Sequence, residues 1–209
     1  MRLLNQGNNH IFISGITQSG KSYFAHRAML SLPGTVLYMN IQGEAVPKGF
    51  VTVYSSMVES SQLIDMLKDG LKINFVFKDV RKGYKITSGY VFDLLMESGF
   101  SESNPIYVGV DECHLLEGFS LEMARYVSTA GLKKGVRCIW ITQRPANCHK
   151  ALYTQAAEQY IFFLSVSEAA YMRVKGIDFD YCQKHWGLRE YHKYCYFDGA
   201  NLVGCEALT

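Results

Sequence analysis

The chain has 209 residues, of which 48% are hydrophobic and 19% charged, and its net charge is +2. This length and composition predict a globular α/β chain with a full core and exclude intrinsic disorder, whereas the small net charge neither indicates nor excludes nucleic-acid binding. No apolar run approaches the roughly 20 residues of a membrane span, and the N-terminal "MRLLNQGNNH" has too short an apolar stretch for a signal peptide, so we expect an intracellular protein without a transmembrane segment.

The first part of the chain predicts a strand, a helix and a second strand. "HIFIS" (10–14) is a short apolar strand, and "KSYFAHRAMLSL" (21–32) is a helix that ends before Pro33 and Gly34. "TVLYMNI" (35–41) follows as a strand that runs into the turn "QGE". A strand, a short loop and a helix in this order are the context that a phosphate-binding loop requires.

The middle of the chain continues the alternation. Strands are predicted at 50–54 and 73–77, and helices at 59–70 and 88–99. Two further strands, "PIYVGV" (105–110) and "RCIWIT" (137–142), lie on either side of a helix at 119–131. Because the apolar residues of these two strands do not alternate with polar ones, we expect both strands to be buried on both faces.

The last third predicts a helix at 148–159, a strand at 160–166, helices near 168–175 and 178–186, and a hairpin that turns at Asp198-Gly199. Strands that alternate with helices predict an α/β fold with a mainly parallel central sheet and helices on both faces. The C-terminal hairpin is expected to add an antiparallel edge. We find no internal repeat or linker, and predict a single domain over residues 1–209.

Residues 15–22 spell "GITQSGKS", the Walker A pattern G-x-x-x-x-G-K-S, between the first strand and the first helix. Backbone N–H groups of such a loop and the positive end of the helix hold phosphate oxygens. Lys21 is expected to reach the β- and γ-phosphates of ATP, and the Ser22 hydroxyl to bind Mg²⁺. The residues predicted to contact the nucleotide are Gly15, Ile16, Thr17, Gln18, Ser19, Gly20, Lys21, Ser22 and Tyr23.

Two adjacent carboxylates end the strand in "IYVGVDECH" (106–114), as in a Walker B motif. Asp111 at the strand end is suited to hold Mg²⁺ through water. Glu112 would then face the γ-phosphate and polarise a water for in-line attack. Nucleotide kinases have no need of this second carboxylate, so the pair favours a hydrolase over a transferase. The alternative is a turn with two solvated acids.

A polar pair, Thr142-Gln143, ends the next buried strand in "CIWITQRPA" (138–146). We expect this strand and the one ending in Asp111 to be sheet neighbours that flank the phosphate loop. Gln143 would then reach both the attacking water and the γ-phosphate. This order of motifs is typical of hydrolases that convert ATP cleavage into movement.

The six cysteines contain no C-x-x-C pair, which favours buried free thiols. Cys182, His185, His192 and Cys195 have a spacing that could supply four zinc ligands. The segment "EYHKYCYF" reads as a strand, however, and strand positions three apart point to opposite faces. We therefore prefer the free-thiol interpretation.

The strings "GITQSGKS", "VGVDE" and especially "ITQRPA" resemble the FtsK/HerA superfamily of DNA-pumping ATPases, in which a T/S-Q-R-P string closes the sensor strand. "MNIQGE" is similar to the acidic turn after that family's second strand, and "EYHKYCYFDG" to its terminal hairpin. A motor of about this size resembles the genome-packaging ATPases of tailless icosahedral viruses with an internal membrane, turreted archaeal viruses among them. The resemblance implies a ring, commonly a hexamer, that threads double-stranded DNA into a preformed viral capsid, in the host cytoplasm or at the virion vertex.

Ring motors of this kind need an arginine supplied across the subunit interface. The resemblance leaves three candidates open, namely Arg125, Arg137 and Arg144, and it adds Arg144 to the expected catalytic residues Lys21, Glu112 and Gln143. Such an arginine contributes roughly 10³–10⁵ in rate.

The segment "KDVRKGYK" (78–85) carries the residues proposed for DNA contact, Lys78, Arg81, Lys82 and Lys85, with Tyr84 between them. In a ring it could line the pore and bind DNA phosphates. The alternative is an ordinary solvated loop between a strand and a helix.

The predicted function is therefore a Mg²⁺-dependent ATPase that translocates double-stranded DNA and packages a viral genome. Two other classes remain open. A morphogenesis ATPase of the filamentous-phage type would drive assembly without gripping duplex DNA, although such proteins usually carry a membrane span. A non-motor nucleotide-binding assembly module would use ATP only to set its shape, and it would have no need of Glu112 and Gln143.

Overall fold

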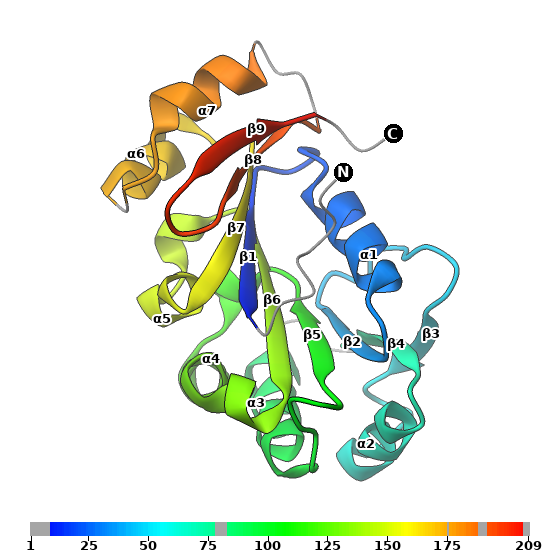
Figure 1. Ribbon diagram of the computed structural model, residues 1–209. Coiled ribbons are helices and arrows are strands. Elements are labelled where there is room, and N and C mark those ends of the chain that lie inside the picture. Colours follow the sequence, from blue (N-terminus) through cyan, green and yellow to red (C-terminus); the bar gives the residue numbers. More distant parts are fainter. Residues whose placement is uncertain (1–8, 78–82, 175, 188–191, 207–209) are drawn as a thin grey trace.

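A twisted, nine-stranded sheet runs through the protein (Figure 1). The computed structural model describes residues 9–77, 83–174, 176–187 and 192–206. The strands are β1 (His10–Ser14), β2 (Thr35–Asn40), β3 (Val51–Tyr54), β4 (Lys72–Val76), β5 (Ile106–Val110), β6 (Val136–Thr142), β7 (Ala156–Phe162), β8 (Tyr194–Phe197) and β9 (Leu202–Cys205). Their spatial order is β3-β4-β2-β5-β6-β1-β7-β8-β9.

The first seven strands pair in parallel, and β8 and β9 continue the sheet in antiparallel pairing. This confirms the predicted sheet with its antiparallel C-terminal edge. The strands β5 and β6 are neighbours, as predicted, but they do not flank β1, because β6 lies between β5 and β1. The turns after β1, β5 and β6 therefore follow one another along the same edge of the sheet.

The helices are α1 (Lys21–Ser31), α2 (Ser60–Lys68), α3 (Gly83–Glu97), α4 (Gly118–Ala130), α5 (Lys150–Thr154), α6 (Val166–Val174) and α7 (Phe179–Trp186). Three short 3₁₀ turns, η1 (Cys113–Leu115), η2 (Gly131–Lys134) and η3 (Pro145–Asn147), follow β5, α4 and β6. None of the helices in these described segments is long and apolar enough to cross a membrane.

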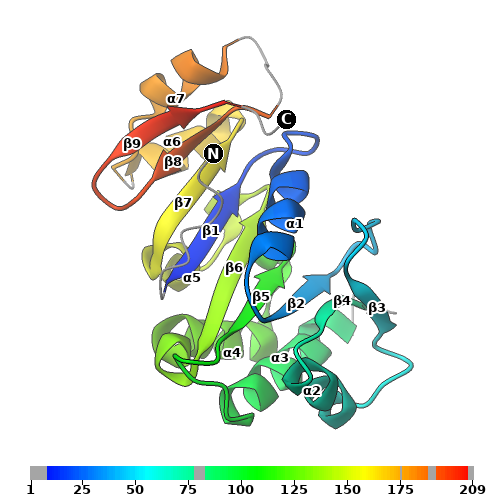
Figure 2. The same cartoon turned by 45° about the vertical axis from the view of Figure 1, so that its right-hand side comes forward.

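Alternating side chains of each central strand enter two separate cores. In β1, Phe12 faces the core formed with α2 to α5, whereas Ile11 and Ile13 face the core formed with α1. Figure 2 shows α1 lying across β1, β6 and β5 on its face of the sheet. Both faces of the central strands are thus covered, which explains why their sequences lack polar alternation.

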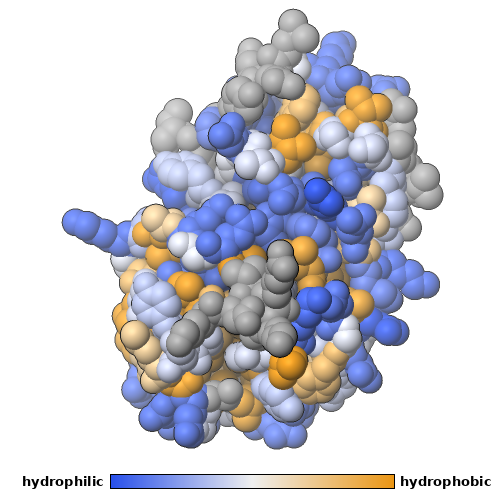
Figure 3. All heavy atoms as spheres, turned by 180° about the vertical axis from the view of Figure 1, so that it is seen from behind, coloured by the Kyte–Doolittle hydropathy of each residue, from blue (hydrophilic) through white to orange (hydrophobic). Residues whose placement is uncertain are grey.

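The helices α6 and α7 form a third core with the C-terminal strands, in which Trp186 packs near Ile161 and Cys195. Seen from behind, the surface is largely hydrophilic, with hydrophobic side chains interspersed (Figure 3).

A lysine ties the end of α1 to the start of β4. The Nζ atom of Lys72 donates to the carbonyl oxygens of Met29, Leu30 and Leu32, at 3.3, 2.6 and 2.7 Å. Met29 and Leu30 lie in the last turn of α1, where carbonyls lack the usual donor four residues on, and Leu32 is the C-cap, whose N–H donates to the Met29 carbonyl. Burial lowers the pKa of Lys72 from its usual value, whereas the negative end of the helix favours its charge.

Two predicted boundaries were wrong. The helix predicted at 148–159 ends at Thr154, and residues from Ala156 onward form β7, which pairs with β1 and places the polar Gln159 in the sheet. The helix predicted at 88–99 begins at Gly83. Its first turn includes Tyr84, whose ring packs against Phe77 and whose hydroxyl is buried. In both cases a tertiary contact sets the boundary: strand pairing with β1 in the first, and packing of the Tyr84 side chain in the second.

Candidate nucleotide-binding site

The loop after β1 is held in place by the two strands beside β1. The Gly15 N–H donates to the Thr142 carbonyl at 3.1 Å, and the Ile16 N–H donates to the Phe163 carbonyl at 2.8 Å. A Cβ atom on Gly15 would lie 2.5 Å from both Phe162 Cβ and Ser19 Oγ. The first glycine is therefore required by the close packing of the loop on β7.

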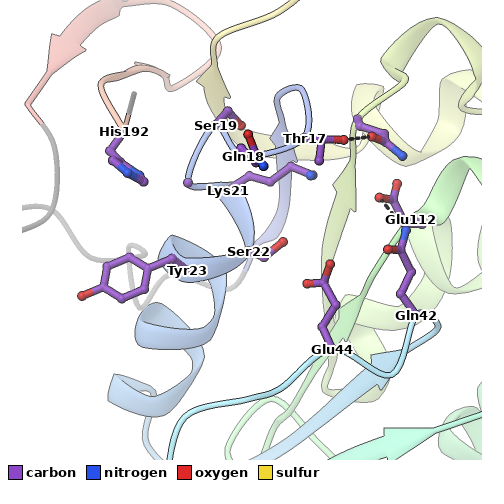
Figure 4. A pocket seen from close by; sticks show the side chains of 12 residues that line it. Thr17, Gln18, Ser19, Lys21, Ser22, Tyr23, Gln42, Glu44, Glu112 and His192 are labelled. Carbon is purple, nitrogen blue, oxygen red and sulfur yellow. Dashed lines mark hydrogen bonds between the residues drawn. The ribbon is translucent and has the colours of Figure 1, made fainter. Parts of the chain in front are cut away.

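The loop then turns into α1 through residues with positive φ. Gly20 has φ +90° and stands at the helix N-cap, and Gln18 has φ +64°. This backbone leaves the first N–H groups of α1 free to bind an anion at the positive end of the helix. The side chain of Lys21 extends across the pocket toward the acidic turns (Figure 4).

A pocket of about 500 Å³ opens beside the loop, a size typical of small-molecule sites. Nearly all of the predicted loop residues line it, together with residues from the turns after β2, β5 and β6 and one residue that precedes β8. The lining residues are Thr17, Gln18, Ser19, Gly20, Lys21, Ser22, Tyr23, Gln42, Glu44, Glu112, Gln143 and His192. Gly15 and Ile16 lie at the start of the loop, and Ile16 lines a neighbouring pocket with Thr17 and Arg144.

The two walls of the pocket differ in chemistry (Figure 4). Gln42, Glu44 and Glu112 stand on one side, and Tyr23 and His192 on the other. His192 lies against the phosphate loop, since a Cβ on Gly20 would collide with its imidazole ring. The acidic wall faces the side chains of Lys21 and Ser22, so phosphates bound by the loop would lie between the two walls.

Asp111 is buried at the end of β5, beneath the acidic wall. Burial, followed by the negative charges of Glu112 and Glu44, raises the pKa of Asp111 to about 7, and the charge of Lys21 opposes this shift. A divalent cation in this neighbourhood would offset the repulsion among the carboxylates. The Asp111 carboxylate and the Ser22 hydroxyl are oxygen donors of the kind that Mg²⁺ prefers, and Ser22 lines the pocket whereas Asp111 lies buried outside its lining.

Glu112 has a left-handed backbone, with φ +46° and ψ +46°. For a residue with a Cβ, such a conformation costs on the order of 1–3 kcal/mol and is commonly found at functional sites. Its side chain is almost fully buried, and only Oε1 accepts a hydrogen bond, whereas Oε2 has a close polar neighbour but no hydrogen-bond partner among the described residues. Gln42 Nε2 donates to Oε1 at 3.2 Å, and His114 Nδ1 lies 3.1 Å from Oε2.

Gln143 connects the turn after β6 to the phosphate loop. Thr17 Oγ1 donates to Gln143 Oε1 at 2.6 Å. The preceding residue, Thr142, accepts the backbone N–H of Arg144 on its Oγ1 at 2.9 Å. The predicted residues Lys21, Glu112 and Gln143 thus meet at one pocket, while Arg144 lies exposed beside it.

The site also contains residues that none of the sequence motifs identified. Gln42 and Glu44 lie in a turn that Asn40 fixes, because its side chain donates to the Glu44 carbonyl and accepts the Glu44 N–H. The acidic string "MNIQGE" was a signal for this turn. His114 and His192 had no such signal, since each reaches the site only through the sheet order.

One predicted arginine is unsuited to act across an interface. Arg137 is buried, and its guanidinium donates to Tyr107 Oη at 2.8 Å and to the Glu102 carbonyl at 3.3 Å. Arg137 is therefore removed from the three arginines considered for a role across the subunit interface. Arg125 is exposed on α4 and Arg144 is exposed on the turn after β6, so these two remain.

The predicted DNA segment is only partly described. Lys78, Arg81 and Lys82 lie outside the described residues, whereas Lys85 is in the first turn of α3 and forms an ion pair with Glu117. Tyr84, which stands between these basic residues in the sequence, is buried. Its hydroxyl donates to the Asp111 carbonyl at 3.0 Å, so it supports the carboxylate turn from below.

The four residues weighed as zinc ligands are spread over separate places. Cys182 and Cys195 interact within the third core, and each is a free thiol. His185 Nε2 lies 3.0 Å from the Cys205 carbonyl, and His192 lines the nucleotide pocket. Across the described segments no group of three or more His, Cys, Asp or Glu side chains is placed to hold a metal ion.

No protein-family model and no curated protein matches the sequence. Among solved structures, the chain is similar to the genome packaging NTPase B204 from Sulfolobus turreted icosahedral virus 2 in complex with sulfate. The TM-score is 0.72 at 11% identity, over 99% of both chains. The same NTPase in complex with AMPPCP gives a TM-score of 0.70 at 11% identity, over 98% of this chain and 100% of that chain.

A third similar structure is EssC (ATPases 2 and 3) from Geobacillus thermodenitrificans. It has a TM-score of 0.61 at 13% identity, over 95% of this chain and 39% of that chain. At these identities the likeness shows the fold. The chain has the P-loop NTPase fold of these neighbours, as the motifs predict.

Proposed function

We propose that this protein is a Mg²⁺-dependent ATPase that moves double-stranded DNA and packages a viral genome into a preformed capsid. The observation that carries the hydrolase part is the placement of Glu112 on the wall of the phosphate-loop pocket, as a buried carboxylate that accepts a hydrogen bond from Gln42 and lies against His114. The packaging part is supported by the likeness to the genome packaging NTPase, which extends over 99% of both chains.

In this proposal, ATP lies with its phosphates on the loop and its base toward Tyr23 and His192. The loop N–H groups and Lys21 bind the β- and γ-phosphates. Ser22 and Asp111, with Glu44 beside them, would hold Mg²⁺, which when bound neutralises charge on the phosphates. These residues orient the γ-phosphate toward the acidic wall.

Glu112 accepts a proton from a water aligned with the γ-phosphate, as a general base. Gln143, bonded to Thr17 of the loop, lies where it can contact both that water and the γ-phosphate. When the γ-phosphate leaves, Gln143 loses a partner, and the turn after β6 is free to shift. We propose that this shift is passed to DNA-contacting segments in a ring of subunits, with Arg125 or Arg144 completing the neighbouring site.

Steady-state ATP hydrolysis with Mg²⁺, measured with and without duplex DNA, tests the proposal. We expect DNA to raise turnover in the wild type. Lys21→Ala should lose nucleotide binding, because it removes the charge that meets the phosphates. Glu112→Gln should keep nucleotide binding and lower turnover by about 10²–10⁴, the usual range for a general base. Normal hydrolysis by Glu112→Gln would contradict the role of Glu112.

A second function is favoured by the likeness to EssC (ATPases 2 and 3), which extends over 39% of that chain. The same ATPase site could drive an assembly or morphogenesis step without gripping duplex DNA. Turnover that vanishes in Glu112→Gln but does not respond to DNA would favour this function. Tight ATP binding with negligible turnover would favour a non-motor assembly module.

A further inference from the structure

A chain of polar contacts leads from Glu112 to the turn after β6, through His114. His114 Nδ1 lies 3.1 Å from Glu112 Oε2 and 3.0 Å from Thr142 Oγ1. Thr142 Oγ1 in turn accepts the N–H of Arg144 at 2.9 Å. The same imidazole nitrogen therefore touches the expected base and the last residue of the strand that carries Gln143.

The sheet brings these residues together although they are far apart in the sequence. His114 lies in η1, directly after β5, and Thr142 ends β6. The two strands pair in parallel, with Val110 opposite Trp140, so the turns that follow them are adjacent. The side chains of His114 and Glu112 are only 7% and 5% exposed, and polar contacts removed from water in this way are strong and directional.

The contact geometry selects one tautomer of His114. An ionised carboxylate can only accept a hydrogen bond, so the nitrogen that faces Glu112 Oε2 must carry the proton. With the proton on Nδ1, the imidazole donates a hydrogen bond to Thr142 Oγ1 at 3.0 Å and places that N–H 3.1 Å from Glu112 Oε2, which has no other polar partner in the described part of the chain. The opposite tautomer would place a lone pair against the buried carboxylate, which is unfavourable.

Gln42 completes the arrangement from the other side. It donates to Glu112 Oε1, and it belongs to the turn that Asn40 holds at the end of β2. Oε1 of Glu112 is thus hydrogen-bonded from the end of β2, while Oε2 lies against His114 after β5. Thr142 adds a third strand end to the same network.

We propose that His114 is a positioning residue that orients Glu112 for water activation and couples it to the turn bearing Gln143. The inference rests on the hydrolase function proposed above for the same pocket. It adds a physical coupling between Gln143 and Glu112. When the γ-phosphate is lost and Gln143 and Thr142 shift, the imidazole of His114, which contacts Thr142, moves with them and displaces Glu112. His114 itself does not line the pocket and so does not contact the nucleotide.

Four variants test this: His114→Leu, His114→Asn, Thr142→Val, and His149→Asn as a control. In His114→Asn the side-chain amide lies near the position that Nδ1 of His114 occupies and can donate a hydrogen bond. In His114→Leu the side chain fills the same space but has no donor. His149 lies nearby, where it caps α5 by accepting the Ala151 N–H at 3.2 Å, and asparagine is also a good cap. For each variant we would measure kcat, ATP affinity and the thermal midpoint.

We expect His114→Leu to lower kcat by about 10- to 100-fold, because misplacing a catalytic group by an ångström can cost about 10² in rate. ATP affinity should stay within about threefold, since the phosphate loop is untouched. His114→Asn should regain most of the lost rate, and His149→Asn should match the wild type. Thr142→Val should also lower kcat. The double variant His114→Leu/Thr142→Val should have a kcat only slightly below that of His114→Leu alone.

Combination with Glu112→Gln gives the decisive readout. If His114 acts through Glu112, then His114→Leu will not further lower the residual single-turnover rate of Glu112→Gln. An equal fold loss in both backgrounds would overturn the proposal. The proposal would also be overturned if His114→Leu lost ATP affinity by the same factor as kcat. It would be overturned as well if His114→Asn had a normal thermal midpoint but did not regain the lost kcat. Absence of hydrolysis in the wild type would instead refute the proposed hydrolase function, before any variant is compared.

Discussion

At the scale of single residues, the site depends on backbone conformations that few side chains tolerate. Gly20 and Glu112 both have positive φ, and Glu112 adopts it despite its Cβ. The surroundings of Glu112 hold this strained residue, because Gln42 donates a hydrogen bond to Oε1 and the His114 imidazole lies 3.1 Å from Oε2. Strain of this kind is stable only where the surroundings over-determine it.

Gly15→Ala provides a residue-scale prediction. The new Cβ would lie 2.5 Å from Phe162 Cβ, an atom anchored to the backbone of β7, so the loop must shift. Such overpacking costs roughly 1–3 kcal/mol, and we expect nucleotide affinity to fall by at least about tenfold. Isothermal titration with a nonhydrolysable ATP analogue would measure this affinity.

Gly70→Ala is the matched control for that variant. Gly70 has φ +79° and no atom within 4 Å of the position of a Cβ. The substitution should cost about 1 kcal/mol of stability through backbone strain, with nucleotide affinity unchanged. Unchanged nucleotide affinity in Gly15→Ala would show that the loop does not depend on its contact with β7.

At the scale of elements, Lys72 links the C-terminal end of α1 to β4. Lys72→Met retains most of the side-chain volume but leaves three carbonyl groups without their cationic donor. Because hydrogen bonds to a charged group contribute about 1.5–3 kcal/mol, we expect the free energy of unfolding to drop by about 1–2 kcal/mol. Urea denaturation measures it, with Lys68→Met on exposed α2 surface as control. A drop of equal size in both variants would contradict the capping role.

The elements that were predictable from the sequence are those defined by local chemistry. The phosphate loop could be found because its glycines, Lys21 and Ser22 are adjacent in the chain, and β5 and β6 because each is a continuous apolar run. The beginning of β7 was missed because residues 156–159 resemble a helix until β1 pairs with them. The contact of Gln42 with Glu112 joins residues 70 positions apart, so only the sheet order reveals it.

At the scale of the whole molecule, two buried histidines make stability depend on pH. Burial lowers the pKa of His10 and of His26 from 6.5 to about 4. His10 Nδ1 accepts the Cys138 N–H at 2.9 Å, which requires that nitrogen to be unprotonated. The unfolded chain takes up these protons below pH 6.5 and the folded chain does not, so the stability that depends on these two histidines is complete above pH 6.5 and is lost as the pH falls toward 4.

Each histidine should therefore remove about 2 kcal/mol of stability between pH 6.5 and pH 5. His10→Asn keeps an acceptor for Cys138 and removes one of the two titrating groups. We expect this variant to be less stable at pH 7.5, through lost packing, but to show a smaller fall in unfolding free energy on acidification. Urea midpoints at pH 7.5, 6.0 and 5.0 would measure this, and a pH dependence equal to that of the wild type would contradict the assignment.

The proposed ring makes a second whole-molecule prediction. If subunits act together, mixing Glu112→Gln protein into wild type should lower DNA-stimulated turnover more steeply than the fraction of variant added. One inactive subunit would then impair several active ones. A linear decline with the mixing fraction would indicate that the subunits hydrolyse ATP independently.

The sheet order also constrains how the chain can fold while it is being synthesised. The strand that carries the phosphate loop, β1, pairs with β6 and β7 in the described structure, and β6 begins only at Val136. At about 5–20 residues per second, the ribosome needs roughly 6–25 seconds to make the intervening stretch. During that interval an apolar strand stands without its partners, so chaperones that cover exposed hydrophobic segments should raise the yield of nucleotide-binding protein during translation.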